Sequence, residues 1–187
     1  MPYQIDPGTN PGGEEFEAYN RRRWGGSGWT RRLIEEGRRD GANFADWRWW
    51  PSTLKAHQLV RYAEERGGVP TSDSNRALFE AAYELGENIS SVDALVRVGT
   101  EGLGLGGDAA AGLQPYLEAD GGADAVLADI REGRRRYGIR SVPFFVIDAE
   151  GRDAPPYGLS GAQGTATFLS HFEAVAFDDD DDDDDDE

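Results

Sequence analysis

The sequence predicts an α/β fold that carries a large helical insertion. Phe144–Ile147 is a short apolar run of aromatic and β-branched residues between Pro143 and Asp148, which is typical of a strand buried on both faces. An amphipathic helix pattern over 122–137 leads into this run, and a second strand and a last helix pattern follow it. Only helical patterns lie between a short N-terminal strand and this C-terminal block, which indicates the insertion.

The N-terminal part begins with a strand pattern at residues 3–5, which the turn sequence Asp6-Pro7-Gly8 closes. A loop rich in glycine and proline continues to residue 13. Helical patterns then follow at 14–24, 29–39, 53–66, 75–85, 91–98, 113–119 and 122–137. Ser52 is expected to cap the third of these helices.

Two of the helical patterns carry apolar residues that we expect to face the core. They are Leu33 and Ile34 in the second helix, and Leu78, Phe79, Ala82 and Tyr83 in the fourth. An aromatic connection at 44–50 holds three of the five tryptophans. In the C-terminal block we expect a turn at 148–151, a strand at Tyr157–Ser160 and a closing helix at 165–176.

The chain has a net charge of −17, and its last ten residues, 178–187, are all acidic. Without them, 26 acidic residues stand against 19 basic ones, which is typical of an acidic globular domain. We predict that 178–187 is a disordered tail, because like charges repel and no apolar contact offsets the ordering entropy. It could serve as a solubility brush, an arm for a basic partner or a weak divalent-cation site, but we favour a solvated, low-complexity chain end without such a role. The negative charge disfavours nucleic acid as a partner.

Composition excludes several classes of protein. No stretch reaches the roughly 18–20 apolar residues that span a bilayer, and no secretory signal is present, so we expect a cytoplasmic protein without a membrane partner. The chain has no cysteine, which excludes a disulfide framework and a thiolate metal site. The glycine run at 102–107 has neither the preceding strand nor the Lys-Ser/Thr pair of a phosphate loop. We expect no metal and no cofactor.

Few side chains are candidates for chemistry. His57 could act as an acid or base near neutral pH, or could simply pack on the apolar face of its helix. Trp50 and its tryptophan neighbours precede that helix, so His57 and Trp50 could line a groove, although core packing is the interpretation that we favour for both. No serine lies in a G-x-S-x-G motif.

Four motifs taken together resemble one family. Residues 138–148 (GIRSVPFFVID), followed by SGAQ and a last helix, are similar to the C-terminal half of a DsbA-family thioredoxin fold. Residues 51–59 (PSTLKAHQL) resemble a helix start of its FrnE-like branch, and 77–83 (ALFEAAY) and 86–89 (GENI) resemble two further motifs of that branch. The resemblance covers about residues 3–172 in matching order and spacing.

The resemblance implies a thioredoxin-like fold with a large all-helical insertion, in an N-terminally truncated form. Residues 1–13 would be a residual strand and loop, 14–121 the insertion, 122–177 the C-terminal thioredoxin half and 178–187 the tail. The family's first strand, its Cys-x-x-Cys motif and its first helix have no counterpart. Either the catalytic segment has been cut from the chain or the protein is a divergent, redox-inactive relative.

The family reaction is thiol–disulfide exchange, which requires a thiolate. The resemblance therefore implies a relative of protein disulfide oxidoreductases that has no catalytic residue of its own. It also implies that Ser141, Val142 and Pro143 bind an extended polypeptide or a thiol substrate, with Pro143 in the cis form. Spacing alone favours a trans bond at Pro143.

Two other functions stay open. One is a relative of glutathione-dependent isomerases and kappa-type transferases, although 160–164 (SGAQG) lacks the charged pair that those enzymes carry there. The other is a non-catalytic module that binds peptides or proteins. If the family's central strand is missing, we expect the two C-terminal strands to pair, residues 3–5 to be poorly paired, and the exposed sheet edge to favour self-association or aggregation.

Overall fold

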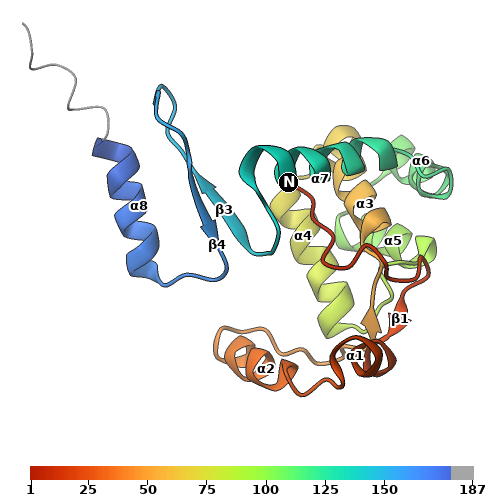
Figure 1. The fold of residues 1–187 in the computed structure, drawn as a ribbon. Helices are drawn as coiled ribbons and strands as arrows, with labels where there is room; N and C mark the ends of the chain where they lie inside the picture. Colours follow the sequence, from red (N-terminus) through yellow and green to blue (C-terminus); the bar gives the residue numbers. More distant parts are fainter. Residues whose placement is uncertain (178–187) are drawn as a thin grey trace, which may run out of the picture. The chain divides into compact units, whose positions relative to one another are not determined.

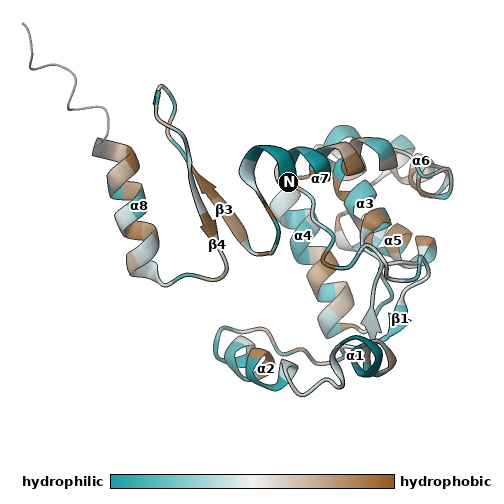
Figure 2. Ribbon diagram, in the orientation of Figure 1, coloured by the Kyte–Doolittle hydropathy of each residue, from teal (hydrophilic) through white to brown (hydrophobic). Residues whose placement is uncertain are grey.

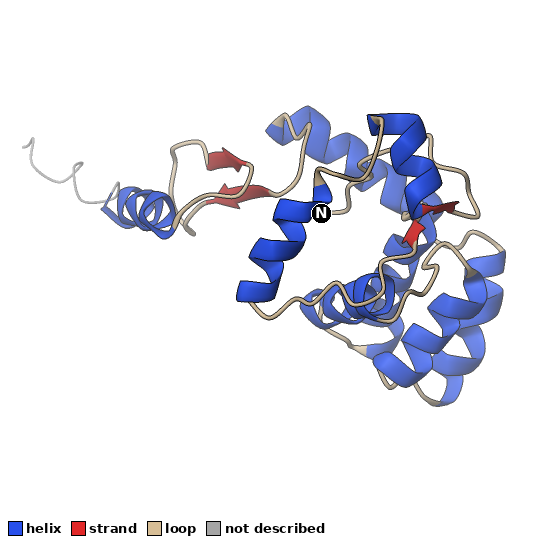
Figure 3. Ribbon diagram, turned by 90° about the horizontal axis from the view of Figure 1, so that it is seen from below, coloured by secondary structure: helices blue, strands red, loops and turns tan. Residues whose placement is uncertain are grey.

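The computed structural model describes residues 1–177 and has an α/β fold (Figure 1). Its eight α-helices in the described part are α1 Phe16–Trp24, α2 Thr30–Arg39, α3 Leu54–Gly67, α4 Thr71–Phe79, α5 Val92–Arg97, α6 Gly107–Glu118, α7 Ala123–Tyr137 and α8 Thr165–Phe177. Two π-helical segments, η1 Glu80–Glu84 and η2 Val98–Gly102, continue α4 and α5. The strands are β1 Glu14–Glu15, β2 Trp49–Trp50, β3 Phe144–Ile147 and β4 Tyr157–Ser160, which form two pairs (Figure 3). The predicted tail at 178–187 lies outside the described residues.

The chain divides into two compact units. The helical unit comprises Pro2 and Gln4–Ala128. The hairpin unit comprises Met1, Tyr3 and the residues from Asp129 onward. The division falls inside α7. No helix of the described residues is long and apolar enough to cross a membrane.

The core of the helical unit lies among α3, α5 and α6. Leu59, Leu95 and Leu113 come from these three helices and are completely buried. Gly99 allows close packing here, since a Cβ at this position would meet a methyl group of Leu113. The predicted helix at 113–119 begins earlier than expected, at Gly107, because the alanine-rich turn before Leu113 is itself a strong helix former.

The α4 region differs from its prediction in two respects. The helix begins at Thr71, directly after Pro70, and not at residue 75. Phe79 was expected to face the core, but 61% of its surface is exposed. The buried face runs through Leu78 and Ala81, and each residue turns a helix by about 100°, so Phe79 points away from that face.

The segment around the tryptophans forms a strand pair that the sequence pattern did not predict. Glu14 pairs with Trp50 and Glu15 with Trp49 in antiparallel register. The helix expected from residue 14 therefore begins two residues later, at Phe16. Two-residue strands are too short to show an alternating pattern, which explains why they were missed.

The prediction for α2 is partly wrong. The helix forms at the expected place, but Leu33, expected to face inward, is 42% exposed, whereas Ile34 is half-buried. Arg32 and Glu36 form an i,i+4 ion pair on this helix. Only the side that carries Ile34 borders the aromatic residues of the unit.

In the hairpin unit, β3 and β4 form the expected antiparallel pair, and α8 follows at the expected place. Ile147, Leu159 and Val175 form the small core between the hairpin and α8. β3 is strongly hydrophobic (Figure 2), yet Phe145 and Val146 are 36% and 41% exposed. The expected burial on both faces is therefore wrong, because the sheet of this unit has two strands and α8 packs on one of its faces.

Residues 3–5 form no strand. This contradicts the strand read from their pattern and agrees with the expectation that they would be poorly paired. The Tyr3 hydroxyl instead donates a hydrogen bond to the Arg140 carbonyl at 2.6 Å, within the hairpin unit. A strand needs a neighbour to pair with, and among the described residues none pairs with this segment.

Candidate functional site

The loop between α7 and β3 carries the three substrate-binding residues implied by the resemblance. Ser141, Val142 and Pro143 are all exposed. The Val142–Pro143 peptide bond is cis, as the resemblance implied. The Ser141 hydroxyl lies 3.0 Å from the Ser160 hydroxyl, which ties the loop to the end of β4.

Among the described residues of the hairpin unit, β3 has a neighbouring strand on one edge only. Gly161 donates its N–H to the Pro143 carbonyl at 2.8 Å, which makes these two residues a hydrogen-bonded pair of the antiparallel ladder. Hydrogen-bonded and non-hydrogen-bonded pairs alternate in such a ladder. The N–H and C=O groups of Phe144 and Val146 therefore point away from β4, toward the free edge.

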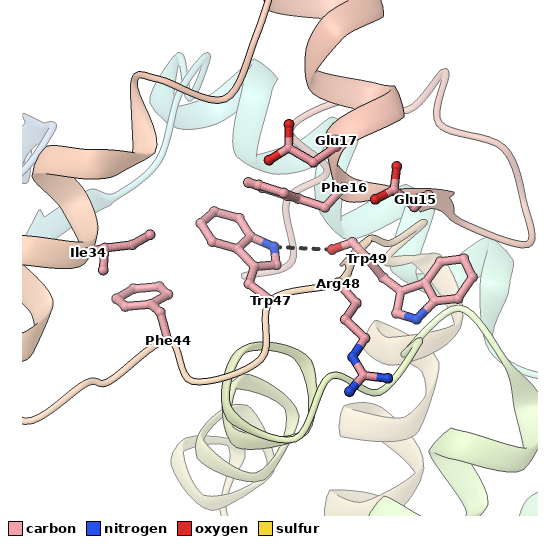
Figure 4. Close-up of a pocket in the computed structure, with 8 residues that line it drawn as sticks. All are labelled: Glu15, Phe16, Glu17, Ile34, Phe44, Trp47, Arg48 and Trp49. Atoms are coloured by element: carbon pink, nitrogen blue, oxygen red, sulfur yellow. Dashed lines mark hydrogen bonds between the residues drawn. The ribbon is translucent and has the colours of Figure 1, made fainter.

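An open pocket of about 490 Å³ lies in the helical unit (Figure 4). It is lined by Glu15, Phe16, Glu17, Ile34, Phe44, Trp47, Arg48 and Trp49. These residues come from β1, α1, α2 and the connection that ends in β2. Figure 4 shows the Trp47 ring between Phe44 and Phe16, with both glutamates on the side of Phe16.

Aromatic contacts hold Trp47 in place. Its ring lies 4.4 Å from Phe16 and 5.0 Å from Tyr83 between centroids, and 6.3 Å from the edge-on ring of Trp29. Its indole Nε1–H donates to the Trp49 carbonyl at 3.1 Å. Packing and a satisfied N–H together fix the orientation of the indole in the pocket wall.

The connection that carries Phe44 is held by one carboxylate, that of Glu84 at the end of η1. Glu84 accepts hydrogen bonds from the backbone N–H groups of Asn43, Phe44 and Ala45, at 2.8, 2.9 and 3.1 Å. These backbone donors, the one from Ala45 foremost, lower the pKa of Glu84. They also support the left-handed backbone of Phe44, whose φ of 51° is unusual for an aromatic residue.

Charged groups on the pocket rim differ in how they are paired. Arg48 forms an ion pair with Asp46 at 2.5 Å. Glu15 caps α1 by accepting the Ala18 N–H at 2.7 Å, and Glu17 accepts the Ser27 hydroxyl at 2.8 Å. Within the described residues neither glutamate forms an ion pair, so the rim has two negative charges that no cation balances.

The pocket is not lined by His57 or Trp50, the two residues that the sequence suggested for a groove. His57 lies half-buried on α3, and Trp50 stacks on Tyr19 with ring centroids 4.2 Å apart and planes within 7°. The aromatic connection at 44–50 did indicate the region of the pocket. Sequence reasoning missed Glu84, because its role depends on a loop that meets the end of η1 only in the folded chain.

Comparison with known proteins adds no identification. Neither a scan against protein-family models nor a search of curated proteins found a match to this chain. Among the described residues, no group of three His, Cys, Asp or Glu side chains is placed to hold a metal ion. The candidate sites are therefore the loop at Pro143 with the β3 edge, and the aromatic pocket.

Proposed function

We propose that the chain is a DsbA/FrnE-like thioredoxin-domain protein that binds extended polypeptides and does not itself exchange thiols. The observation that carries the proposal is the free edge of β3, which lies directly after the exposed residues Val142 and Pro143. The order of α7, loop, β3, β4 and α8 supports it, because the resemblance implies this order.

Strand addition is the binding mode that this edge favours. An extended segment placed along β3 would pair with the outward N–H and C=O groups of Phe144 and Val146. Such main-chain hydrogen bonds provide affinity with little dependence on sequence. The exposed side chains of Val142 and Val146 would add apolar contacts to alternate side chains of the segment.

Thiol exchange is not part of the proposed activity of this polypeptide. Attack on a disulfide requires a thiolate, and the chain has no cysteine. The hydroxyl groups of Ser141 and Ser160 lie at the loop, but no histidine or carboxylate in the described part of the chain is hydrogen-bonded to either one. An assay of insulin reduction should therefore give background rates.

Titration calorimetry tests the proposal against its glutathione-binding alternative. A reduced and carboxymethylated protein provides an unfolded polypeptide without thiols, and glutathione serves as the second ligand. We expect binding of the unfolded polypeptide and none of glutathione. Binding of glutathione alone would favour the isomerase or kappa-type transferase relative and overturn the proposal.

A matched pair of variants locates the binding. Val146→Pro removes the outward N–H of residue 146 without removing a hydrogen bond to β4. Val146→Ala shortens the same side chain and keeps the N–H. We expect the proline variant to bind the polypeptide more weakly than the alanine variant. Equal binding by the two would show that the β3 edge is not the binding surface.

A further inference from the structure

We propose that the aromatic pocket of the helical unit binds an organic cation, namely a guanidinium or alkylammonium group on an apolar stem. This proposal does not depend on polypeptide binding at β3, since all residues that line the pocket belong to the helical unit. Three features carry it, namely the aromatic walls, the charge of the rim and the fixed shape of the loop.

The walls of the pocket are aromatic. Phe16, Phe44 and Trp47 lie together in the pocket, with Ile34 beside Phe44 (Figure 4). Tryptophan is the side chain whose ring face attracts cations most strongly. Because Trp47 already contacts Phe16 and Tyr83, its ring does not need to be ordered when a ligand arrives.

The rim selects for positive charge. The carboxylates of Glu15 and Glu17 bind only neutral donors, the Ala18 N–H and the Ser27 hydroxyl. The one cation of the lining, Arg48, is neutralised by Asp46. A bound cation would therefore meet two carboxylates whose charge is not balanced, whereas an anion would be repelled by them.

The loop is held in shape before any ligand binds. Glu84 fixes the backbone from Asn43 to Ala45, and Asp46 donates its N–H to the Tyr83 carbonyl at 3.1 Å. Gly86 allows this approach, because a Cβ there would lie 2.7 Å from the Asp46 carboxylate. A pocket built in this way loses little conformational entropy on binding.

The test compares cations with neutral ligands of the same shape. The ligands are acetyl-arginine amide against acetyl-citrulline amide, and choline against 3,3-dimethyl-1-butanol. Binding is followed by NMR of the indole N–H groups, with Trp47 and Trp49 as the reporters and Trp24 as the internal control. We expect shifts confined to the two reporters, and about tenfold weaker binding of each neutral ligand.

The ligand pair also identifies the source of the cation. Tighter binding of the arginine amide would assign the pocket to basic side chains of a polypeptide, and tighter binding of choline would assign it to a small free amine. Neutral ligands that bind as tightly as their charged partners would overturn the proposal, as would an absence of shifts with both cations.

Variants test the role of the rim. Glu15→Gln with Glu17→Gln removes both charges but keeps an oxygen acceptor for Ala18 and Ser27. The matched control, Glu64→Gln with Glu101→Gln, changes the net charge equally at two exposed residues outside the pocket. We expect about tenfold weaker binding of the cation by the first pair and unchanged binding by the control. An equal loss in both would assign the effect to net charge and contradict the site.

Discussion

The Glu84 carboxylate accepts the backbone N–H of Phe44 at 2.9 Å, across 40 residues of sequence. The same carboxylate also binds the N–H groups on either side of Phe44. One side chain at the end of η1 thus fixes the position of the loop that forms a wall of the aromatic pocket. Glu84 does not itself line the pocket, and it acts by holding that loop in position.

Glu84→Gln is expected to destabilise the helical unit at neutral pH. The lowered pKa of Glu84 means that the folded chain favours the ionised carboxylate more than the unfolded chain does. The ionised Glu84 carboxylate therefore stabilises the fold at any pH above its pKa in the unfolded chain. This stabilisation is lost as pH falls through the lower pKa that the group has in the folded chain. Urea unfolding of wild type and variant should differ at about pH 7 and converge in acid.

Glu80→Gln is the control for that measurement. Glu80 lies on the same π-helical segment, and its exposed side chain forms no hydrogen bond or ion pair with the other described residues. Only its backbone is bonded, through its N–H to the helix before it and through its carbonyl to the N–H of Leu85. Its replacement should change the unfolding midpoint little at any pH. A pH-dependent loss of the same size in both variants would contradict the role assigned to Glu84.

Gly86→Ala should cost more stability than Gly104→Ala. Both glycines have nearly the same positive φ, 66° and 67°, so each substitution costs about 1–2 kcal/mol of backbone strain. A Cβ on residue 86 would also press on the Asp46 carboxylate, whereas one on residue 104 would meet open space. Chemical denaturation measures the loss in the free energy of unfolding for each variant. Equal losses would mean that the loop at Asp46 does not approach Gly86 closely.

Leu113→Ala is expected to lower the free energy of unfolding by about 2–5 kcal/mol, since it opens a cavity in a completely buried site. Leu85→Ala is the matched control, because Leu85 is 63% exposed. Its effect should stay within about 0.5 kcal/mol. Similar losses at the two positions would contradict the placement of the core among α3, α5 and α6.

Tyr19→Phe should reduce the loss of stability in alkali. Burial first, and then the hydrogen bond to Asp6, raise the pKa of Tyr19 to about 12. Between about pH 10 and that value the unfolded chain has lost a proton that the folded chain retains, so wild-type stability falls as pH rises. The phenylalanine variant has no such proton to lose. The difference in the free energy of unfolding between the two proteins should therefore shrink as pH rises toward about 12. Near-ultraviolet circular dichroism verifies that the stack on Trp50 remains.

The C-terminal elements could be predicted because their signals are local. The apolar run Phe144–Ile147 and the pattern over 122–137 define a strand and a helix without reference to the rest of the chain. The strand at residues 3–5 failed for the opposite reason, since a strand forms only beside a partner. Exposure of Phe145 likewise depends on how many strands and helices surround β3, which its own sequence does not encode.

The pocket was predictable only in outline. Its tryptophans stood out because several large aromatic side chains occur within a few residues. Ile34, which also lines the pocket, and Glu84, which holds its loop, come from other helical segments, and no periodicity links them to Trp47. The pairing of β1 with β2, which brings Glu15 beside Trp49, joins two-residue strands far apart in sequence.

Hydrogen exchange at the four amides of β3 tests the central proposal most directly. The N–H groups of Phe144 and Val146 point to the free edge, whereas those of Phe145 and Ile147 already donate to β4. On addition of an unfolded, carboxymethylated polypeptide, exchange should slow at the first two amides and stay unchanged at the other two. Binding of the polypeptide with unaltered exchange at Phe144 and Val146 would contradict strand addition at β3.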